Sequence, residues 1–369
     1  MNCGTFRTIA VALTVTSIAL GFCHGQDKEI RLQDYIDDPT KLYSWKKTIP
    51  DGWKMQQGIC ERRIEHHMAL YGAQVLASVP DEPVFPPKKP RQLLVLQMFF
   101  HDDTSGMQGT FLAALESMAE KTAAFEIKVI PTLTDITRNE LFAFDAVVVN
   151  GANYSLVAES IDPEKLYTDE TDFRVKSCLR YHYMFEKTAE RRAHGNAMRQ
   201  ALLEYVNAGG GLVGIGAAPR SAWPAYRRMF GCTDTEDYGL VIGEKEPKTL
   251  LTDLLEIRAA EKNPLTQMLP EEGALTVSSG LFVPDREFFE RSSNQVLLSI
   301  DVASSQSKLR KQLSPKTEWE DSVPATWARN QGDGRVFYAS FECSGRFMMN
   351  REIQNHILGG IQYAVGDQP

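Results

Sequence analysis

The stretch at residues 207–224, NAGGGLVGIGAAPRSAWP, decides the fold that we expect for this chain. Its short apolar run at 212–215 has glycines on both sides, which is typical of a strand buried on both faces of a parallel sheet. Apolar residues before it fall at helical spacing, and the glycines after Asn207 predict the end of that helix. The stretch therefore predicts a helix that leads into a central parallel strand.

The turn after this strand is a candidate ligand-binding element. Gly214 and Gly216 are small enough for a tight turn that brings backbone amides close to a ligand. Open α/β sheets bind ligands at such strand ends. Glycines chosen only for close packing are the alternative explanation.

The pattern on both sides of this stretch predicts an α/β fold with a doubly wound, mostly parallel sheet. Short apolar runs alternate with amphipathic segments before it, and further strands follow it, among them a hairpin with its turn at 331–334. The expected strands are 93–99, 126–130, 144–150, 254–259, 275–283, 295–301 and the hairpin strands that end near 341. The expected helices are 61–76, 107–120, 138–143, 222–229 and 351–365.

Polar residues follow two of the expected parallel strands. His101 and Asp102 come after the strand 93–99, and Asn150 ends the strand 144–150. Helix capping explains the polar cluster around Thr104 and Ser105, but His101 titrates near neutrality and lies where doubly wound folds bind ligands. A plain turn is the alternative explanation for Asn150.

The first 25 residues predict a secretory signal peptide. Arg7 precedes an apolar run at 9–22 and a small-residue end, and the run is shorter than the roughly 20 residues that span a bilayer. We therefore expect an exported protein, periplasmic or extracellular, with no stable membrane insertion; an uncleaved anchor is the alternative. Residues 26–90 form an extension, whose partner could be another protein, and 91–369 form the main domain with an insertion at about 160–194.

Charge and cysteine content restrict the classes of partner. Removing Arg7 with the signal takes the net charge from −8 to −9, which disfavours nucleic acid as a partner. Two cysteines are removed with the signal peptide. The four that remain could form disulfides or stay as free thiols, and the sequence is consistent with both. These four are Cys60, Cys178, Cys232 and Cys343.

Several motifs resemble the ThuA-like, or trehalose-utilisation, family over roughly residues 93–366. They are AGGGLVGIGAAP at 208–219 with Trp-Pro at 223–224, NPLT at 263–266, GDGRVFY at 332–338 and GGIQYA at 359–364. The resemblance implies a fold similar to class I glutamine amidotransferases, a flavodoxin-like three-layer arrangement with a C-terminal hairpin. It also implies a carbohydrate role toward glucosides or keto-sugar derivatives, with histidines and sometimes a divalent metal at the sheet edge.

The chain departs from these families at three polar positions. Amidotransferases have a nucleophilic cysteine where this chain has Gly216, so glutamine hydrolysis by that route lacks its nucleophile. ThuA-like proteins commonly have a histidine at that position, an acidic pair where this chain has Ser279-Gly280, and Gly-His where it has Glu342-Cys343. The pair His101-Asp102 does match the family.

Three functional readings follow from the resemblance and its departures. In the first, the chain is an enzyme on a sugar derivative, with His101 as acid or base, Asp102 orienting it and Glu342 as a second acid or base. In the second, it is a noncatalytic relative in which Asn150, Arg220 and Trp223 hold a sugar. In the third, the extension captures a protein partner. The cofactor is unknown, and a divalent metal is left open.

Overall fold

The run 212–215 forms an interior strand of the sheet in the computed structural model. β4 (Gly211–Ile215) is buried along its whole length and pairs in parallel with β3 (Ala146–Asn150) and β9 (Gly334–Ala339). The prediction of a central parallel strand is thus confirmed. The structure describes residues 62, 64–97, 102–130, 133–151, 189–216, 218–219, 223–231, 254–260, 263–269, 275–279, 281–282, 284, 289–301, 322–341 and 346–368.

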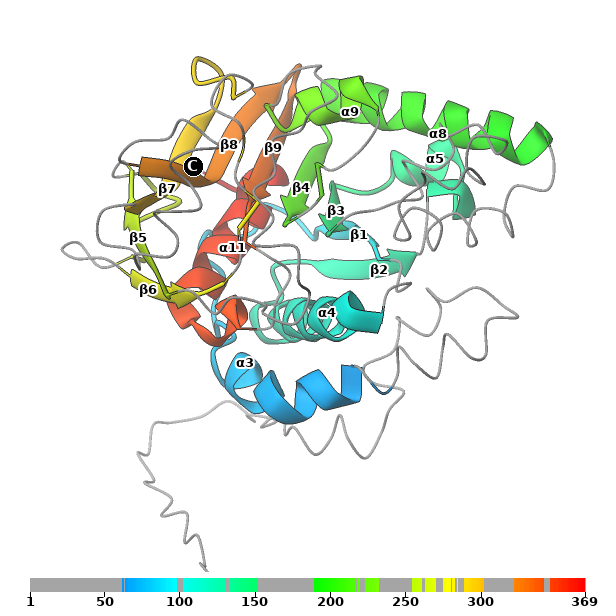
Figure 1. Cartoon of the computed structure of the whole chain (residues 1–369). Helices are drawn as coiled ribbons and strands as arrows, with labels where there is room; N and C mark the ends of the chain where they lie inside the picture. Colours follow the sequence, from blue (N-terminus) through cyan, green and yellow to red (C-terminus); the bar gives the residue numbers. More distant parts are fainter. Residues whose placement is uncertain are drawn as a thin grey trace, which may run out of the picture. The chain divides into compact units, whose positions relative to one another are not determined.

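Nine strands form one mixed sheet in these ranges, in the order β2-β1-β3-β4-β9-β8-β7-β5-β6 (Figure 1). The first five are parallel to one another, and the four pairings from β9 to β6 are antiparallel. The α/β class is confirmed, and the sheet is as much antiparallel as parallel. The other strands are β1 (Gln92–Leu96), β2 (Glu126–Ile130), β5 (Leu254–Ala259), β6 (Leu275–Ser278), β7 (Gln295–Asp301) and β8 (Ser322–Gln331).

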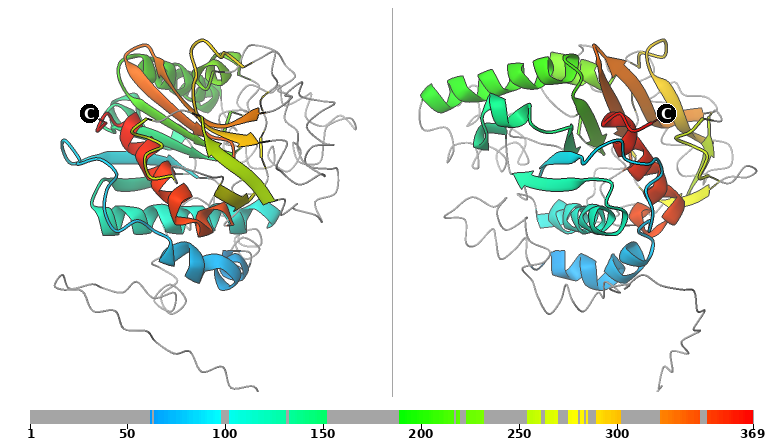
Figure 2. Two further views of the ribbon diagram at one scale, coloured as in Figure 1. Left: turned by 90° about the vertical axis from the view of Figure 1, so that its left-hand side faces the viewer. Right: turned by 180° about the vertical axis from the view of Figure 1, so that it is seen from behind.

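Helices cover both faces of the sheet (Figures 1 and 2). Consecutive residues of β9 show the two faces, because the ring of Phe337 lies against Gly360 of α11 while that of Tyr338 contacts Phe230, which follows α9. α4 lies on the α11 side, and α8 with α5 lies on the α9 side. These helices are α4 (Asp102–Thr122), α5 (Arg138–Leu141), α8 (Ala189–Asn207), α9 (Pro224–Met229) and α11 (Arg351–Ala364). No helix in the described ranges has the length and apolar character to cross a membrane.

The C-terminal end of α8 and the N-terminal end of α4 are the helix ends that position the site. α8 ends at Asn207, and Gly209, with φ at 111°, turns the chain into β4 as predicted. α4 begins at Asp102, five residues before the expected start, so Thr104 and Ser105 lie inside the helix and not at its N-cap position. The residues of the first turn are polar, so the apolar periodicity that predicts a helix begins only after them. Polar residues are common there because the first four N–H groups of a helix have no intrahelical partner.

The chain before β1 packs on the α4 and α11 side of the domain. It contains a π-helical turn, η2 (Met68–Gly72), followed by α3 (Ala73–Ala77). Side chains of α11 hold its backbone: Gln354 Nε2 donates to Val75 O at 2.7 Å, and Gln362 Oε1 accepts from Phe85 N at 3.0 Å. The remaining short helices are η3 (Leu133–Asp135) and η5 (Phe347–Met349).

Candidate amide site at the ends of the parallel strands

Polar residues meet where the central parallel strands end. Strand register aligns Asn150 at the end of β3 with Ile215 at the end of β4, and Ile215 with Ala339 of β9. Gln97 directly follows Leu96, which pairs with Val149. The carboxyl ends of these strands therefore share one edge of the sheet, which is where open α/β sheets bind ligands.

Three side-chain amides form a cluster at this edge, which we name the amide cluster: Gln97, Gln108 and Asn150. Asn150 Nδ2 donates to Gln97 Oε1 at 2.6 Å and to the backbone oxygen of Gln108 at 3.3 Å. Gln108 Nε2 in turn donates to the backbone oxygen of Asn150 at 3.3 Å. All three residues are buried, with exposed fractions of 0, 4 and 2%. The cluster thus joins β1, β3 and α4.

The amide cluster leaves three buried polar atoms without a hydrogen bond to any described residue. They are Gln97 Nε2, Gln108 Oε1 and Asn150 Oδ1. A buried polar atom without a partner costs about 1–3 kcal/mol, and such atoms in native proteins are normally met by water or a ligand. The cluster therefore carries unmet hydrogen-bonding capacity at the ligand-binding edge of the fold.

Gly216 forms the tight turn beside this cluster. Its φ is 59°, a left-handed conformation that favours glycine, and its N–H donates to Ala339 O at 2.8 Å. The Tyr338 hydroxyl donates to the Gly216 carbonyl oxygen. Both backbone groups of Gly216 are thus used within the fold. The predicted contact of the Gly216 backbone amide with a ligand therefore has a competing partner in Ala339 O.

The neighbouring Gly214 has a packing role. A Cβ atom there would lie 2.4 Å from the ring of Phe230 and 3.0 Å from that of Tyr338, so only glycine fits. The packing explanation thus holds for Gly214, and its contact with a ligand stays a prediction.

A series of stacked rings lies on the opposite face of the sheet from the amide cluster. Trp223, the half-buried N-cap residue of α9, stacks on Tyr226 with centroids 5.9 Å apart and planes at 6°. Tyr226 contacts Phe230, which contacts Tyr338. Burial raises the pKa of Tyr226, whose hydroxyl has no hydrogen bond to a described residue. The rings lead from Trp223 to the Tyr338 hydroxyl at Gly216.

The residues predicted to be catalytic fall largely outside the described part of the chain. This holds for His101, Glu342 and the predicted ligand residue Arg220. Only the backbone of Asp102 is described, and Asp102 is the first residue of α4. Within the described ranges, no group of three or more His, Cys, Asp or Glu side chains could hold a metal ion. The catalytic roles and the metal stay predictions.

Sequence reasoning identified Asn150 but missed its two partners. Gln97 follows the apolar run of β1, and Gln108 lies among the apolar residues of α4. A polar residue at a position that periodicity assigns to the core is the signal that could have found both, since buried amides need partners.

Comparisons with known proteins place the chain in context. The family model ThuA, described as trehalose utilisation, matches residues 98–364. Among solved structures, a ThuA-like protein from Bacteroides uniformis has 13% identity and a TM-score of 0.46, over 77% of this chain and 93% of that one. A ThuA-like protein from Parabacteroides merdae has 14% identity and a TM-score of 0.42, over 76% and 91%. A comparison with curated protein sequences found no significant match.

Proposed function

The chain belongs to the ThuA family of trehalose utilisation, and from this premise we propose that it binds a glucoside or keto-sugar derivative at the carboxyl ends of β1, β3 and β4. The protein is exported after removal of residues 1–25 and works outside the cytoplasm. It has no glutaminase activity, because Gly216 replaces the cysteine nucleophile of the amidotransferases.

The amide cluster is the observation that carries this proposal. Sugars have hydroxyl groups that both donate and accept hydrogen bonds, and side-chain amides offer both kinds of atom. Gln97 Nε2 and Asn150 Oδ1 lack described partners at the edge where the fold class binds ligands. Trp223 stacks on Tyr226 on the opposite face of the sheet, so its contact with the sugar stays a prediction that is separate from the amide cluster.

Catalysis in this proposal rests on His101, Asp102 and Glu342. His101 is the general acid or base, Asp102 orients it, and Glu342 is the second acid or base. The main alternative is a noncatalytic sugar-binding relative. The amide cluster would serve it equally well, because side-chain amides bind hydroxyl groups without exchanging protons.

A binding and turnover experiment tests the proposal. The mature chain is screened by thermal shift against trehalose, methyl α-D-glucopyranoside and the 3-keto derivative of that glucoside, each with and without chelator. His101→Ala is then compared with His194→Ala, a control on α8 whose ring contacts Ile136 O. Positioned proton transfer is worth roughly 10² or more in turnover, so the first variant should lose that factor and the second should not.

The outcomes separate the readings. Ligand binding without turnover, with only a modest affinity loss in His101→Ala, supports the noncatalytic alternative. A wild-type protein that none of these sugars stabilises contradicts the carbohydrate proposal itself.

A further inference from the structure

We propose that the amide cluster is a hydroxyl-recognition site, with Gln97 and Gln108 as specificity-determining residues beside Asn150. It takes two neighbouring uncharged hydroxyl groups of a sugar ring and rejects carboxylate and phosphate groups. This inference rests on the proposed function, because it assigns the substrate chemistry of that same site.

The hydrogen bonds within the cluster fix which atoms face a ligand. Asn150 Nδ2 is held by two oxygens, Gln97 Oε1 at 2.6 Å and Gln108 O at 3.3 Å. Its Oδ1 therefore points away from both. Gln108 Nε2 donates to Asn150 O at 3.3 Å, which leaves its own Oε1 unused. Turning any of these amides over would place two oxygens or two NH₂ groups together and break the cluster.

The atoms left over are one donor and two acceptors. Gln97 Nε2 is the donor, and Gln108 Oε1 and Asn150 Oδ1 are the acceptors, all buried and without a described partner. A complementary ligand must donate at least twice and accept at least once, since the free NH₂ group carries two hydrogens. Two adjacent hydroxyls do this, because each O–H donates one hydrogen and its oxygen still accepts.

An anionic group does not fit this pattern. Ionised carboxylates and fully ionised phosphates only accept, so they could use Gln97 Nε2 but would face the oxygens of Gln108 and Asn150. Neutral amides also supply no positive charge to offset the burial of an anion. The cluster therefore discriminates by repulsion as well as by attraction.

Water is the competing occupant, because one water molecule also donates twice and accepts once. A water held for structural reasons would make the cluster indifferent to the ligand. The two cases differ in one measurable way: only a hydroxyl-recognition site couples the side chains of the cluster to particular hydroxyls of the sugar.

The test is a double-mutant cycle between side chain and ligand. Calorimetric affinities are measured for methyl α-D-glucopyranoside and its 2-, 3- and 4-deoxy analogues, with wild type, Gln97→Met and Gln108→Met. Gln92→Met is the matched control, because Gln92 is the same residue type at the start of β1, opposite to the end that Gln97 follows, and makes an exposed hydrogen bond to Glu126. Circular dichroism melting establishes that each variant is folded.

We expect at least one deoxy analogue to bind wild type about tenfold or more weakly, the range for a lost buried hydrogen bond. That penalty should shrink to about threefold or less in Gln97→Met or Gln108→Met and persist in Gln92→Met. Phosphate and acetate should not compete with the glucoside. If one Met variant does not fold, the other carries the cycle, because Gln97 and Gln108 each contribute one of the unused atoms.

Two results would overturn the inference while leaving the proposed function intact. One is a deoxy penalty that is the same in wild type and in every variant, as a structural water predicts. The other is competition by phosphate or acetate that disappears in the cluster variants. A wild type that binds no glucoside would remove the proposed function, and this inference with it.

Discussion

The two ends of the central parallel strands treat buried polar groups in opposite ways. At the carboxyl ends, the amide cluster is neutral and leaves three atoms without described partners. At the amino ends, charged side chains are matched by opposite charges, although Asp367 Oδ2 also lacks a hydrogen bond to a described residue. Arg91, just before β1, bonds both Asp367, which follows α11, and Asp145, just before β3. One end is therefore organised for stability, and the other keeps capacity for a ligand at some cost in stability.

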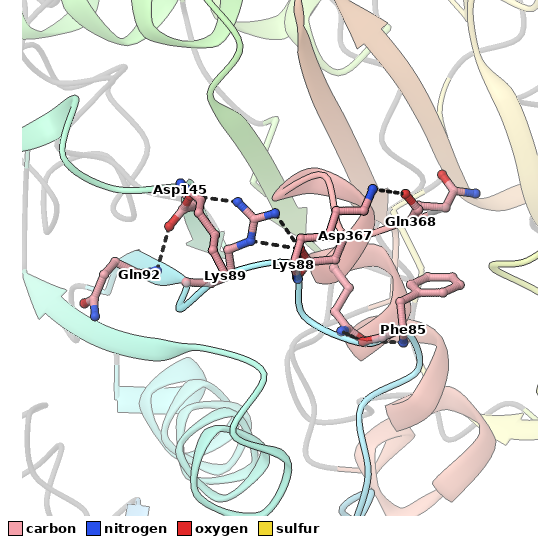
Figure 3. A network of polar contacts seen from close by, with 9 residues as sticks. Phe85, Lys88, Lys89, Gln92, Asp145, Asp367 and Gln368 are labelled. Carbon is pink, nitrogen blue, oxygen red and sulfur yellow. Dashed lines mark hydrogen bonds and ion pairs between the residues drawn. The ribbon is translucent and has the colours of Figure 1, made fainter.

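Hydrogen bonds and ion pairs around Asp145 and Asp367 form one network at the amino ends of the strands (Figure 3). Asp367, whose side chain is fully buried, accepts through Oδ1 from Arg91 Nε at 2.9 Å and Lys88 N at 3.1 Å. Asp145 accepts from Gln92 N at 2.9 Å and pairs with Lys89 at 2.7 Å. Burial acts to raise the pKa of Asp145, but its hydrogen bonds, the strongest from Lys89, hold that pKa below its ordinary value.

The largest expected effect tests the amino end. Arg91→Leu should lower the free energy of unfolding by about 3–5 kcal/mol, because it leaves the buried Asp367 carboxylate without its counter-charge. Urea unfolding measures the change. Arg138→Leu is the control, since its pair with Glu204 is exposed and should contribute within about 1 kcal/mol. Equal losses in the two variants would contradict the contrast between the ends.

A second test uses a buried histidine whose two ring nitrogens both have hydrogen-bond partners. His356 Nδ1 donates to Leu265 O, and Nε2 accepts from the Thr326 hydroxyl, each at 2.8 Å. Because a carbonyl oxygen only accepts, Nδ1 carries a proton, and the lowered pKa of the buried ring leaves Nε2 without one near neutral pH. Burial lowers the pKa of His356 to about 4, against a slight opposing effect of the Leu265 hydrogen bond.

The pH dependence follows from this pKa. The unfolded chain binds the proton below about pH 6.5 and the folded chain only near pH 4, so stability is full above pH 6.5 and falls as the pH is lowered. We expect about 2–3 kcal/mol to be lost between pH 7.5 and 4.5. Urea unfolding of His356→Gln at both values should show a smaller loss. An unchanged loss in the variant would show that other groups cause it.

A third test compares two buried glutamines. The side chain of Gln362 has hydrogen-bond partners at both of its polar atoms, whereas Gln108 belongs to the amide cluster. Gln362 bonds Val84 N at 2.8 Å and Phe85 N at 3.0 Å, so Gln362→Met should cost about 2–3 kcal/mol. Gln108→Met loses one 3.3 Å bond but removes an unmet acceptor, so its effect should stay within about 1 kcal/mol. Thermal melts of both variants measure the difference. Similar large losses would make the amide cluster structural.

Local patterns predicted most elements of the fold. The apolar run of β4 and the Gly332 turn of the β8–β9 hairpin each lie within one short segment of the sequence, and both predictions are confirmed. Strand order is not local: β9 pairs with β4 although Gly211 and Arg335 are far apart in the chain. The same holds for the bond from Arg91 to Asp367, since long-range pairs depend on the packed fold rather than on spacing.

The candidate site was predictable only in part. Asn150 stood out because it ends a strand, and strand ends bind ligands in this fold class. Gln97 and Gln108 did not, because glutamine is usually exposed, and the only signal of their burial is their place within an apolar pattern. Their partnership with Asn150 arises only when β1, β3 and α4 come together.

The central claim is that the carboxyl-end amides meet the ligand while the other buried amides serve the fold. Side-chain NH₂ signals of ¹⁵N-labelled protein, followed during titration with methyl α-D-glucopyranoside, test it directly. We predict saturable shifts for Gln97, Gln108 and Asn150, and none for Gln354 and Gln362, whose NH₂ groups hold the backbone of the segment before β1. Saturable binding that shifts other signals and leaves the three cluster amides unchanged would contradict the claim.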